Sequence, residues 1–479
     1  MRREPARELA ETRRGYLIAA AGCGKTQTVC EAASLHDDGR QLILTHTHAG
    51  VKAVRTRLGL LNVPARKVVV GTIAGFALRY ASRYPRLSGL EVGRPSTSDE
   101  WSAVYEAATR LAMRNAVRRV LTESYAGLYV DEYQDCDLRQ HALVLALADV
   151  LPCRVVGDPM QAIFRWQASV EWDRDVDSNF QRLDDLDTPW RWVGTNPGLG
   201  EWLVGVRTEL AAGRSIDLTT GPTQWSGNEM PNKLATCHRV ANLGGSVVAI
   251  GNRAADCHSF ARKMKGRYTS MEEIECRDLV KHAGLIEGAS GPARSVAVID
   301  FAKECLTKVG TELGGMRMAF SRGDIPIPRV NTKHPAVLAA LTAVATDDSH
   351  ARVLDAMGPI ESIEGTVVAR RELWGEMRRA IRCREAGTQP TLPDAAWYVR
   401  DAWRHGGRRV DDRTISRTLL VKGLEFDHAI VLDAGAHDSR NIYVALTRGA
   451  VSLSVLAESP TLIPRAESGS PSSHPLVAG

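Results

Sequence analysis

The sequence feature that most constrains the fold is the segment Ala19-Ala20-Ala21-Gly22-Cys23-Gly24-Lys25-Thr26, which follows an apolar run and precedes a plausible helix. Its glycines permit close approach of the backbone to phosphate, and the start of the following helix favours anions. Lys25 can reach the β and γ phosphates of a nucleotide, and Thr26 can bind magnesium. The segment predicts a phosphate-binding loop, for which the alternative is a glycine-rich turn with a chance Lys-Thr pair. The predicted nucleotide contacts are Ala21, Gly22, Cys23, Gly24, Lys25 and Thr26.

Apolar, β-rich runs alternate with helix-like segments over the first part of the chain, at residues 15–20, 41–45, 67–71, 126–130 and 154–157. This alternation implies a parallel sheet with helices on both faces. The later runs 246–251 and 428–433 resemble strands of a second α/β unit, and a long helical-looking stretch separates them. The chain has 479 residues, more than the roughly 250 to 300 at which one core stops growing. We therefore expect an α/β protein of at least two domains.

A second motif, Leu128-Tyr129-Val130-Asp131-Glu132-Tyr133-Gln134-Asp135, delivers adjacent carboxylates to the end of a predicted strand. Asp131 can hold a metal ion, while Glu132 points elsewhere and can polarise an attacking water as a general base. An acidic turn after a buried strand is the alternative for this segment alone. The phosphate-binding loop makes that alternative the weaker one.

A third motif, Val156-Gly157-Asp158-Pro159-Met160-Gln161-Ala162-Ile163-Phe164-Arg165-Trp166, again places a turn after a strand. Gln161 could sense the γ-phosphate or the attacking water. Phe164 and Trp166 lie two residues apart beyond it, and exposed aromatic faces can stack on unpaired bases. Aromatic residues of a buried core are the alternative. The neighbouring motifs favour stacking.

Further motifs complete a resemblance to one family. They lie at Leu44 to Leu58, Gly71 to Ala77, Trp190-Arg191, Lys422 to Phe426 and Tyr443 to Arg448. In this order, and together with the three motifs above, the chain resembles the UvrD, Rep and PcrA type of superfamily 1A DNA helicases. The resemblance extends from roughly Leu17 to Val455.

The resemblance implies roles in a cleft between two RecA-like motor domains. Arg191 and Arg448 would approach the γ-phosphate from the far side, Trp190 would stack on adenine, and Glu425, in the same motif as Gly423, would contact the ribose. An Arg that reaches across a cleft can stabilise charge in the transition state. The implied catalytic residues are Lys25, Glu132, Gln161, Arg191 and Arg448.

For nucleic acid, the resemblance points to a groove that carries His46, Thr47, Thr72, Phe164, Trp166 and Arg253. Hydroxyl groups and Arg can hold phosphates, whereas aromatic rings stack on bases without reading the sequence. We therefore expect little sequence specificity. The expected partner is single-stranded DNA or a tailed duplex.

The positions of the motifs predict the domain boundaries. Residues 1–80 with 124–197 form the first RecA-like domain, and 198–262 with 410–462 form the second. Residues 81–123 and 263–409 are expected to be inserted, mostly helical subdomains, the first of them reduced. Residues 463–479 are rich in Ser, Pro and Gly and are expected to be a flexible tail.

The sequence also departs from the family pattern. No Gln precedes the phosphate-binding loop, where the family reads adenine, and Ala74 replaces a common His. The net charge of +5 is mild and compatible with a local basic groove. The sequence contains no run of about 18 apolar residues, so we expect no membrane partner. Its nine cysteines lack CxxC spacing. A cytoplasmic location is expected.

These observations predict an ATP-dependent and Mg²⁺-dependent translocase or helicase on single-stranded DNA, with 3′-to-5′ polarity. The alternative is a DNA-stimulated ATPase that acts as a sensor with a partner nuclease, similar to the helicase-like subunit of the Gabija antiphage system. Defence, repair and plasmid or phage replication are not distinguished by the sequence. Kinase chemistry would leave the later Arg and aromatic motifs unexplained.

Overall fold

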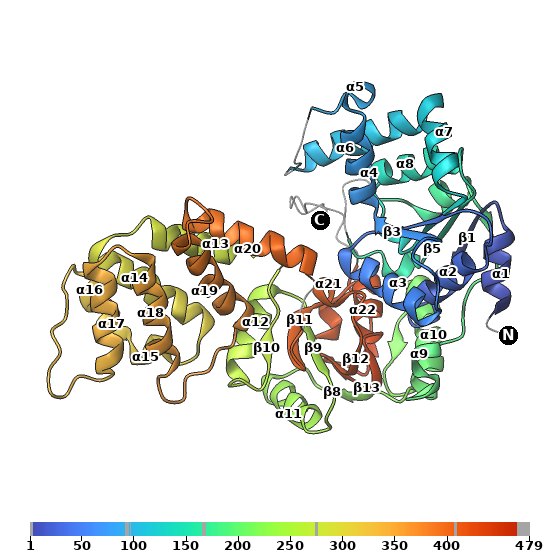
Figure 1. Cartoon of the computed structure of the whole chain (residues 1–479). Helices are drawn as coiled ribbons and strands as arrows, with labels where there is room; N and C mark the ends of the chain where they lie inside the picture. The colour runs from blue at the N-terminus through green and yellow to red at the C-terminus, as the bar shows by residue number, and fades with distance from the viewer. Residues whose placement is uncertain are drawn as a thin grey trace. The chain divides into compact units, whose positions relative to one another are not determined.

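The computed structural model describes residues 3–91, 95, 97–164, 169–273, 276–406 and 410–466 (Figure 1). The chain forms two compact units. Unit 1 is Met1–Gly227 with Lys422–Asp427 and Asp433–Gly479, and unit 2 is Asn228–Val421 with His428–Leu432. Of the predicted tail, residues 467–479 lie outside the described part of the chain.

Unit 1 contains a six-stranded sheet with the order β3-β2-β4-β5-β1-β6. Neighbouring strands are parallel throughout. β2, β4 and β5 are buried along their whole length, as expected for a sheet covered on both faces. The carboxyl ends of the parallel strands share one edge of the sheet. The strands are β1 (Arg14–Ile18), β2 (Gln41–Thr45), β3 (Val68–Thr72), β4 (Gly127–Val130), β5 (Cys153–Gly157) and β6 (Gln181–Arg182).

Two hydrophobic cores lie on the two faces of this sheet, and β2 shows why. Ile43 belongs to one core, whereas Leu42 and Leu44 belong to the other, because side chains alternate along a strand. The first core is covered by α1 (Arg3–Glu11), α2 (Lys25–Ser34) and α3 (His48–Leu60). The second is covered by α4 (Ile73–Arg83), α6 (Ser98–Ala112), α7 (Asn115–Ser124) and α8 (Leu138–Ala148), and the short α5 (Pro85–Ser88) packs on α6.

Later segments of the chain also belong to unit 1. α10 (Pro197–Ala211) follows the short α9 (Trp190–Val193) and packs on α22 (Ser439–Leu446). β13 (Gly449–Leu456) pairs in parallel with β8 (Gln224–Ser226). β14 (Thr461–Leu462) pairs in antiparallel fashion with β7 (Ile216–Asp217). Motifs near the end of the sequence therefore join the unit that carries the phosphate-binding loop.

Unit 2 contains a second parallel sheet, in which β10 (Thr269–Ser270), β11 (Arg413–Arg417), β9 (Val247–Gly251) and the part of β12 (Phe426–Val431) from His428 onwards follow one another. α12 (Ala254–Lys263) packs on β9 and β11, and α11 (Met230–Ala241) packs on β9. The four-residue α21 (Thr418–Val421) follows β11. These strands and helices are the second α/β element that the sequence predicts.

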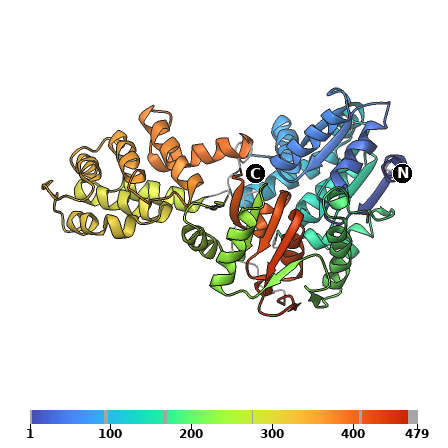
Figure 2. The ribbon, with the colours of Figure 1, turned by 90° about the horizontal axis from the view of Figure 1, so that it is seen from below.

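Between β10 and β11 the chain forms a helical subdomain, which lies to one side of these strands within unit 2 (Figures 1 and 2). Its own core includes Phe301 and Trp374, whose rings stack with centroids 5.4 Å apart. The predicted α/β class with helical insertions is thus confirmed. No helix among the described residues is long and apolar enough to cross a membrane. The helices are α13 (Arg277–Glu287), α14 (Gly291–Cys305), α15 (Val309–Glu312), α16 (Gly314–Ser321), α17 (Pro335–Thr346), α18 (His350–Glu361), α19 (Arg371–Glu385) and α20 (Leu392–Gly406).

Candidate nucleotide and nucleic-acid sites

The phosphate-binding loop connects the end of β1 to the start of α2. Gly22 and Gly24 have φ of +75° and +90°, a region that favours glycine. A Cβ on Gly22 would lie 2.5 Å from the ring of Trp192, so a side chain there would also clash. α2 begins at Lys25, whose buried ammonium donates to the Ala19 carbonyl across 2.9 Å. The loop thus has the strand, glycine and helix arrangement that binding of phosphate requires.

Asp131 lies just after β4, beside this loop. Its Oδ2 accepts a 2.8 Å hydrogen bond from the Thr26 hydroxyl. Burial and the neighbouring Glu132 carboxylate raise the pKa of Asp131 to about 6. A hydroxyl and a carboxylate are hard oxygen ligands of the kind that Mg²⁺ prefers. The pair would hold a magnesium ion, which would supply charge neutralisation beside the phosphate-binding loop.

Glu132 is held in a strained backbone conformation. Its φ is +58°, in the left-handed region, which costs a non-glycine residue about 1 to 3 kcal/mol. Burial raises the pKa of its carboxyl, but the ammonium groups of Lys25 and Lys422 outweigh burial and hold that pKa below its ordinary value. An ionised carboxylate beside the phosphate-binding loop is able to accept a proton from water.

A buried hydrogen-bond network joins Glu132 to the loop after β5. The Gln134 amide nitrogen donates to Glu132 across 2.5 Å, and its oxygen accepts from the backbone N–H of Asp158 across 3.0 Å. Asp158 also accepts from the Gln161 amide nitrogen across 2.9 Å. Gln134 was not among the site residues predicted from the sequence, although it belongs to the same motif as Glu132. The structure therefore connects the predicted base with the predicted γ-phosphate sensor.

The predicted arginines lie close together in unit 1. Arg191 donates to the Thr447 carbonyl across 2.6 Å and to the Glu425 carboxylate across 2.5 Å. Arg448 is 1% exposed, and burial lowers the pKa of its guanidinium. Its guanidinium donates to neutral groups, namely the carbonyls of Val444 and Leu424 and the hydroxyl of Thr447. A desolvated guanidinium of this kind gains from an approaching anion.

Two hydrogen bonds tie this arginine region to the phosphate-binding loop. The backbone N–H of Ala21 donates to the Tyr443 hydroxyl across 2.9 Å, and that of Arg191 donates to the Gly22 carbonyl across 3.2 Å. Trp190 is 40% exposed, and its indole lies 3.4 Å from the position of a Cβ on Gly24. The predicted adenine-stacking ring thus has an accessible face next to the loop. Cys23 is buried in the loop, and Gly423, with φ of +77°, precedes the segment that carries Glu425.

The predicted nucleic-acid residues of unit 1 occupy different environments. Thr47 and Thr72 cap the starts of α3 and α4, where their hydroxyls accept from the N–H groups of Gly50 and Gly75. Thr47 is exposed and Thr72 is buried. Each Thr therefore also has a structural reason to be where it is.

His46 and the predicted aromatic residues differ in how far the structure describes them. His46 lies 3.4 Å from the Cys136 sulfur, and burial lowers the pKa of its imidazole to about 3, so the ring is neutral. Phe164 is partly buried. Trp166 lies outside the described residues. Arg253 is exposed at the start of α12 in unit 2, and its place relative to the other residues is therefore not described.

Lys422 is a second residue that the sequence analysis did not select. Its ammonium bonds the Asp135 carboxylate, donates to the Gln161 carbonyl across 2.6 Å and lies 4.8 Å from the centre of the Phe164 ring. Lys422 and Asp135 are both buried. One side chain therefore connects the loop after β4, the predicted γ-phosphate sensor Gln161 and a predicted base-stacking ring. Its position at the start of the Lys422 to Phe426 motif was the available signal.

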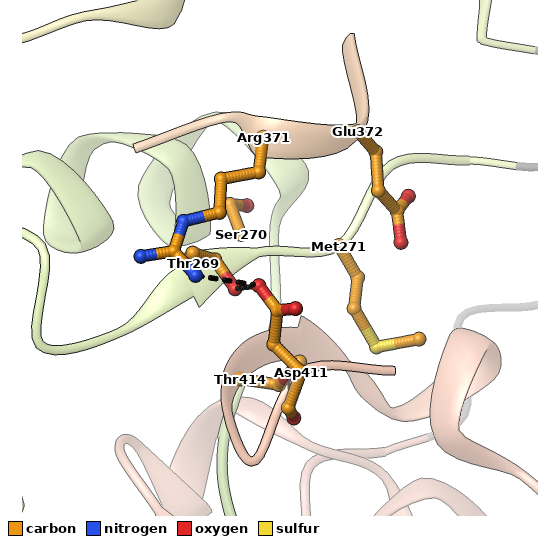
Figure 3. A pocket seen from close by; sticks show the side chains of 7 residues that line it. All are labelled: Thr269, Ser270, Met271, Arg371, Glu372, Asp411 and Thr414. Atoms are coloured by element: carbon orange, nitrogen blue, oxygen red, sulfur yellow. Dashed lines mark hydrogen bonds and ion pairs between the residues drawn. The ribbon is translucent and has the colours of Figure 1, made fainter. Parts of the chain in front are cut away.

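Unit 2 has a small polar cavity of about 140 Å³ (Figure 3). Arg371 and Thr269 point at the Asp411 carboxylate, with contacts of 3.4 and 2.7 Å. These groups satisfy one another, and the cavity contains no residue of the nucleotide motifs. The lining residues are Thr269, Ser270, Met271, Arg371, Glu372, Asp411 and Thr414.

Comparisons with known proteins agree with the motifs. Residues 98–172 match the model of the UvrD/REP helicase N-terminal domain. No curated protein matches the chain significantly. Among solved structures, the chain is similar to the arterivirus nonstructural protein 10 helicase in complex with DNA, with 13% identity, a TM-score of 0.27 and coverage of 51% of this chain and 49% of that one. It thus spans about half the length of that helicase. It is also similar to the Pif1 helicase of Candida albicans, with 10% identity, a TM-score of 0.41 and coverage of 97% and 95%.

At these identities the structural likenesses do not carry an assignment. The family-model match covers the motif of Asp131 and Glu132. The phosphate-binding loop precedes that motif, and the later Arg motifs follow it in the family's order. Over residues 98–172 the chain is therefore similar to the UvrD/REP helicase N-terminal domain.

Proposed function

We propose that this protein is an ATP-dependent translocase on single-stranded DNA, that it moves in the 3′-to-5′ direction, and that it can act as a helicase. The observation that carries the proposal is the contact between Thr26 and Asp131, made beside Lys25 and Glu132. Together these four side chains supply metal ligands, a phosphate-binding cation and a general base at one edge of the first sheet. Hydrolysis of a nucleoside triphosphate needs these groups.

The chain's own residues fit the nucleotide in named roles. The backbone of residues 21–26 would cradle the phosphates, Lys25 would neutralise the β and γ phosphates, and Thr26 and Asp131 would hold magnesium. The bound metal supplies charge neutralisation on the phosphate oxygens. Glu132 would take the proton of the attacking water. Arg191 and Arg448 would stabilise the charge that develops on the γ-phosphate.

Coupling to DNA is supported by the contacts of Lys422. Its ammonium binds the Gln161 carbonyl and faces the Phe164 ring, so movement around the γ-phosphate sensor would reach a ring suited to stacking on a base. Stacking on one aromatic residue contributes about 1 to 3 kcal/mol per base. Such a contact is strong enough to hold a base and weak enough to release it in each cycle.

The test is strand displacement on duplexes that carry a single-stranded tail at either the 3′ or the 5′ end. The expected result is ATP-dependent displacement from the 3′-tailed duplex only, with the Lys25→Ala variant as the inactive control. Displacement from the 5′-tailed duplex alone would contradict the proposed polarity. DNA-stimulated ATP hydrolysis without displacement or translocation would favour the alternative of a sensor that acts with a partner nuclease.

A further inference from the structure

Asp158 is a buried carboxylate at the centre of the network that joins Glu132 and Gln161. It follows β5, and its side chain is fully buried. One oxygen accepts from the Met160 N–H across 3.1 Å, and the other accepts from the Gln161 amide across 2.9 Å. Its own backbone N–H donates to Gln134. Asp158 is therefore in contact with both amide side chains that the hydrolytic site uses.

A buried carboxylate requires a compensating charge, and α10 supplies one. Arg207 donates to the same oxygen of Asp158 from two nitrogens, at 2.8 and 3.2 Å. Its side chain is 23% exposed. Burial lowers the pKa of the Arg207 guanidinium, but the Asp158 carboxylate outweighs burial and raises it. Asp158 and Arg207 therefore form a stable ion pair.

We infer that Arg207 is a positioning residue for ATP hydrolysis, which acts through Asp158 on Gln161 and Glu132. The reason lies in the amide groups. An amide side chain can turn end for end, and its neighbours decide which end faces which group. An ionised carboxylate only accepts hydrogen bonds, so the nitrogen of Gln161 must face Asp158 and its oxygen must face away.

Gln134 is oriented in the same way. The Asp158 N–H can only donate, so it fixes the oxygen of Gln134 and turns the amide nitrogen towards Glu132. Arg207 holds the Asp158 carboxylate in place, and thereby keeps both amides in the orientation suited to hydrolysis. The ligand is the nucleoside triphosphate of the proposed function, on which this inference rests.

The test is steady-state ATP hydrolysis with saturating single-stranded DNA by the full-length wild type, Arg207→Met and Arg207→Lys. We expect Arg207→Met to lower kcat by about tenfold to a hundredfold, the usual effect of removing a group that orients a site residue, with little change in the KM for ATP. Arg207→Lys keeps the charge and should recover much of the rate. The matched control is Arg214→Met, which should behave as wild type. Arg214 lies just beyond α10 and forms an exposed ion pair with Glu209.

A folded Arg207→Met protein with the kcat of wild type would overturn this inference while leaving the proposed function intact. If Arg207→Met does not fold, the double variant Asp158→Asn with Arg207→Met carries the test, because it removes both buried charges. A low kcat in the folded double variant would support the positioning role, and a normal kcat would overturn it. A wild-type protein without ATP hydrolysis would overturn the proposed function and this role together.

Discussion

The Thr26 hydroxyl and the Asp131 carboxylate meet at 2.8 Å although they are 105 residues apart in the chain. The contact joins the start of α2 to the end of β4 at the carboxyl edge of the first sheet. If this pair holds magnesium, EDTA should stop ATP hydrolysis and added Mg²⁺ should restore it. Thr26→Val should raise the Mg²⁺ concentration needed for half-maximal rate by about tenfold or more, whereas Thr26→Ser should stay near wild type. An unchanged requirement in Thr26→Val would contradict the assignment.

Lys25 and Glu132 should fail in different ways when they are replaced. Lys25→Ala removes charge from the phosphates and should weaken both nucleotide binding and hydrolysis. Glu132→Gln keeps the shape of the side chain but removes the base, so hydrolysis should fall by about 10² to 10⁴-fold while nucleotide binding persists. Binding of a fluorescent ATP analogue and single-turnover hydrolysis separate the two effects. Undiminished turnover by Glu132→Gln would exclude it as the base.

Much of this site could be predicted because the residues of each motif are contiguous in the sequence. The phosphate-binding loop and the Asp131-Glu132 pair each follow a predicted strand, and parallel strands bring their carboxyl ends together. Predicted strands lie within about two residues of those observed, as with 428–433 against Phe426–Val431. These strands and motifs depend on the local pattern of residue types, which is visible in a single sequence.

Residues that act through distant partners could not be predicted. Arg207 lies 49 residues from Asp158, and Lys422 lies 287 residues from Asp135, so only the folded chain brings these charges together. The helix-capping roles of Thr47 and Thr72 could have been predicted from the sequence, because each Thr directly precedes a helix. Trp166, which we expect to stack on a base, lies outside the described residues.

Arg448 should contribute to the chemical step more than to binding. Its guanidinium is buried among neutral acceptors, so the arriving γ-phosphate would supply the missing negative charge. Arg448→Gln should lower single-turnover hydrolysis by about 10³-fold or more. The melting temperature without nucleotide should change little, because removal of a desolvated charge offsets the lost hydrogen bonds. A rate within twofold of wild type would remove Arg448 from the mechanism.

The Lys422 and Asp135 pair predicts a pH-dependent stability defect. Lys422→Met removes the ammonium that bonds the buried Asp135 carboxylate, which should cost about 3 to 5 kcal/mol of unfolding free energy at pH 8. Burial raises the pKa of Asp135 to about 7 in the folded protein, from 3.8. A raised carboxyl pKa contributes stability that is complete below pH 3.8 and is lost as the pH rises through about 7. Without Lys422 this pKa should rise further, so the cost of Lys422→Met should shrink between pH 8 and pH 6.

Urea unfolding of wild type, Lys422→Met and the double variant Lys422→Met with Asp135→Asn at both pH values checks this prediction. The double variant should recover most of the stability at pH 8, since both charges are gone. It should not recover stimulation by DNA, which depends on the ammonium beside Phe164. A cost that is equal at the two pH values would show that Asp135 is not the group whose ionisation opposes folding when Lys422 is absent.

Whether this protein is a nucleic-acid motor is tested by the steady-state rate of ATP hydrolysis by the wild type as single-stranded DNA is added, with Lys25→Ala as the blank. We predict a basal rate that rises several-fold and saturates with single-stranded DNA, in a manner largely independent of its sequence, while blunt duplex DNA of equal length stimulates far less. Absence of ATP hydrolysis, or a rate that no single-stranded nucleic acid changes, would contradict the account of this protein as a nucleic-acid motor.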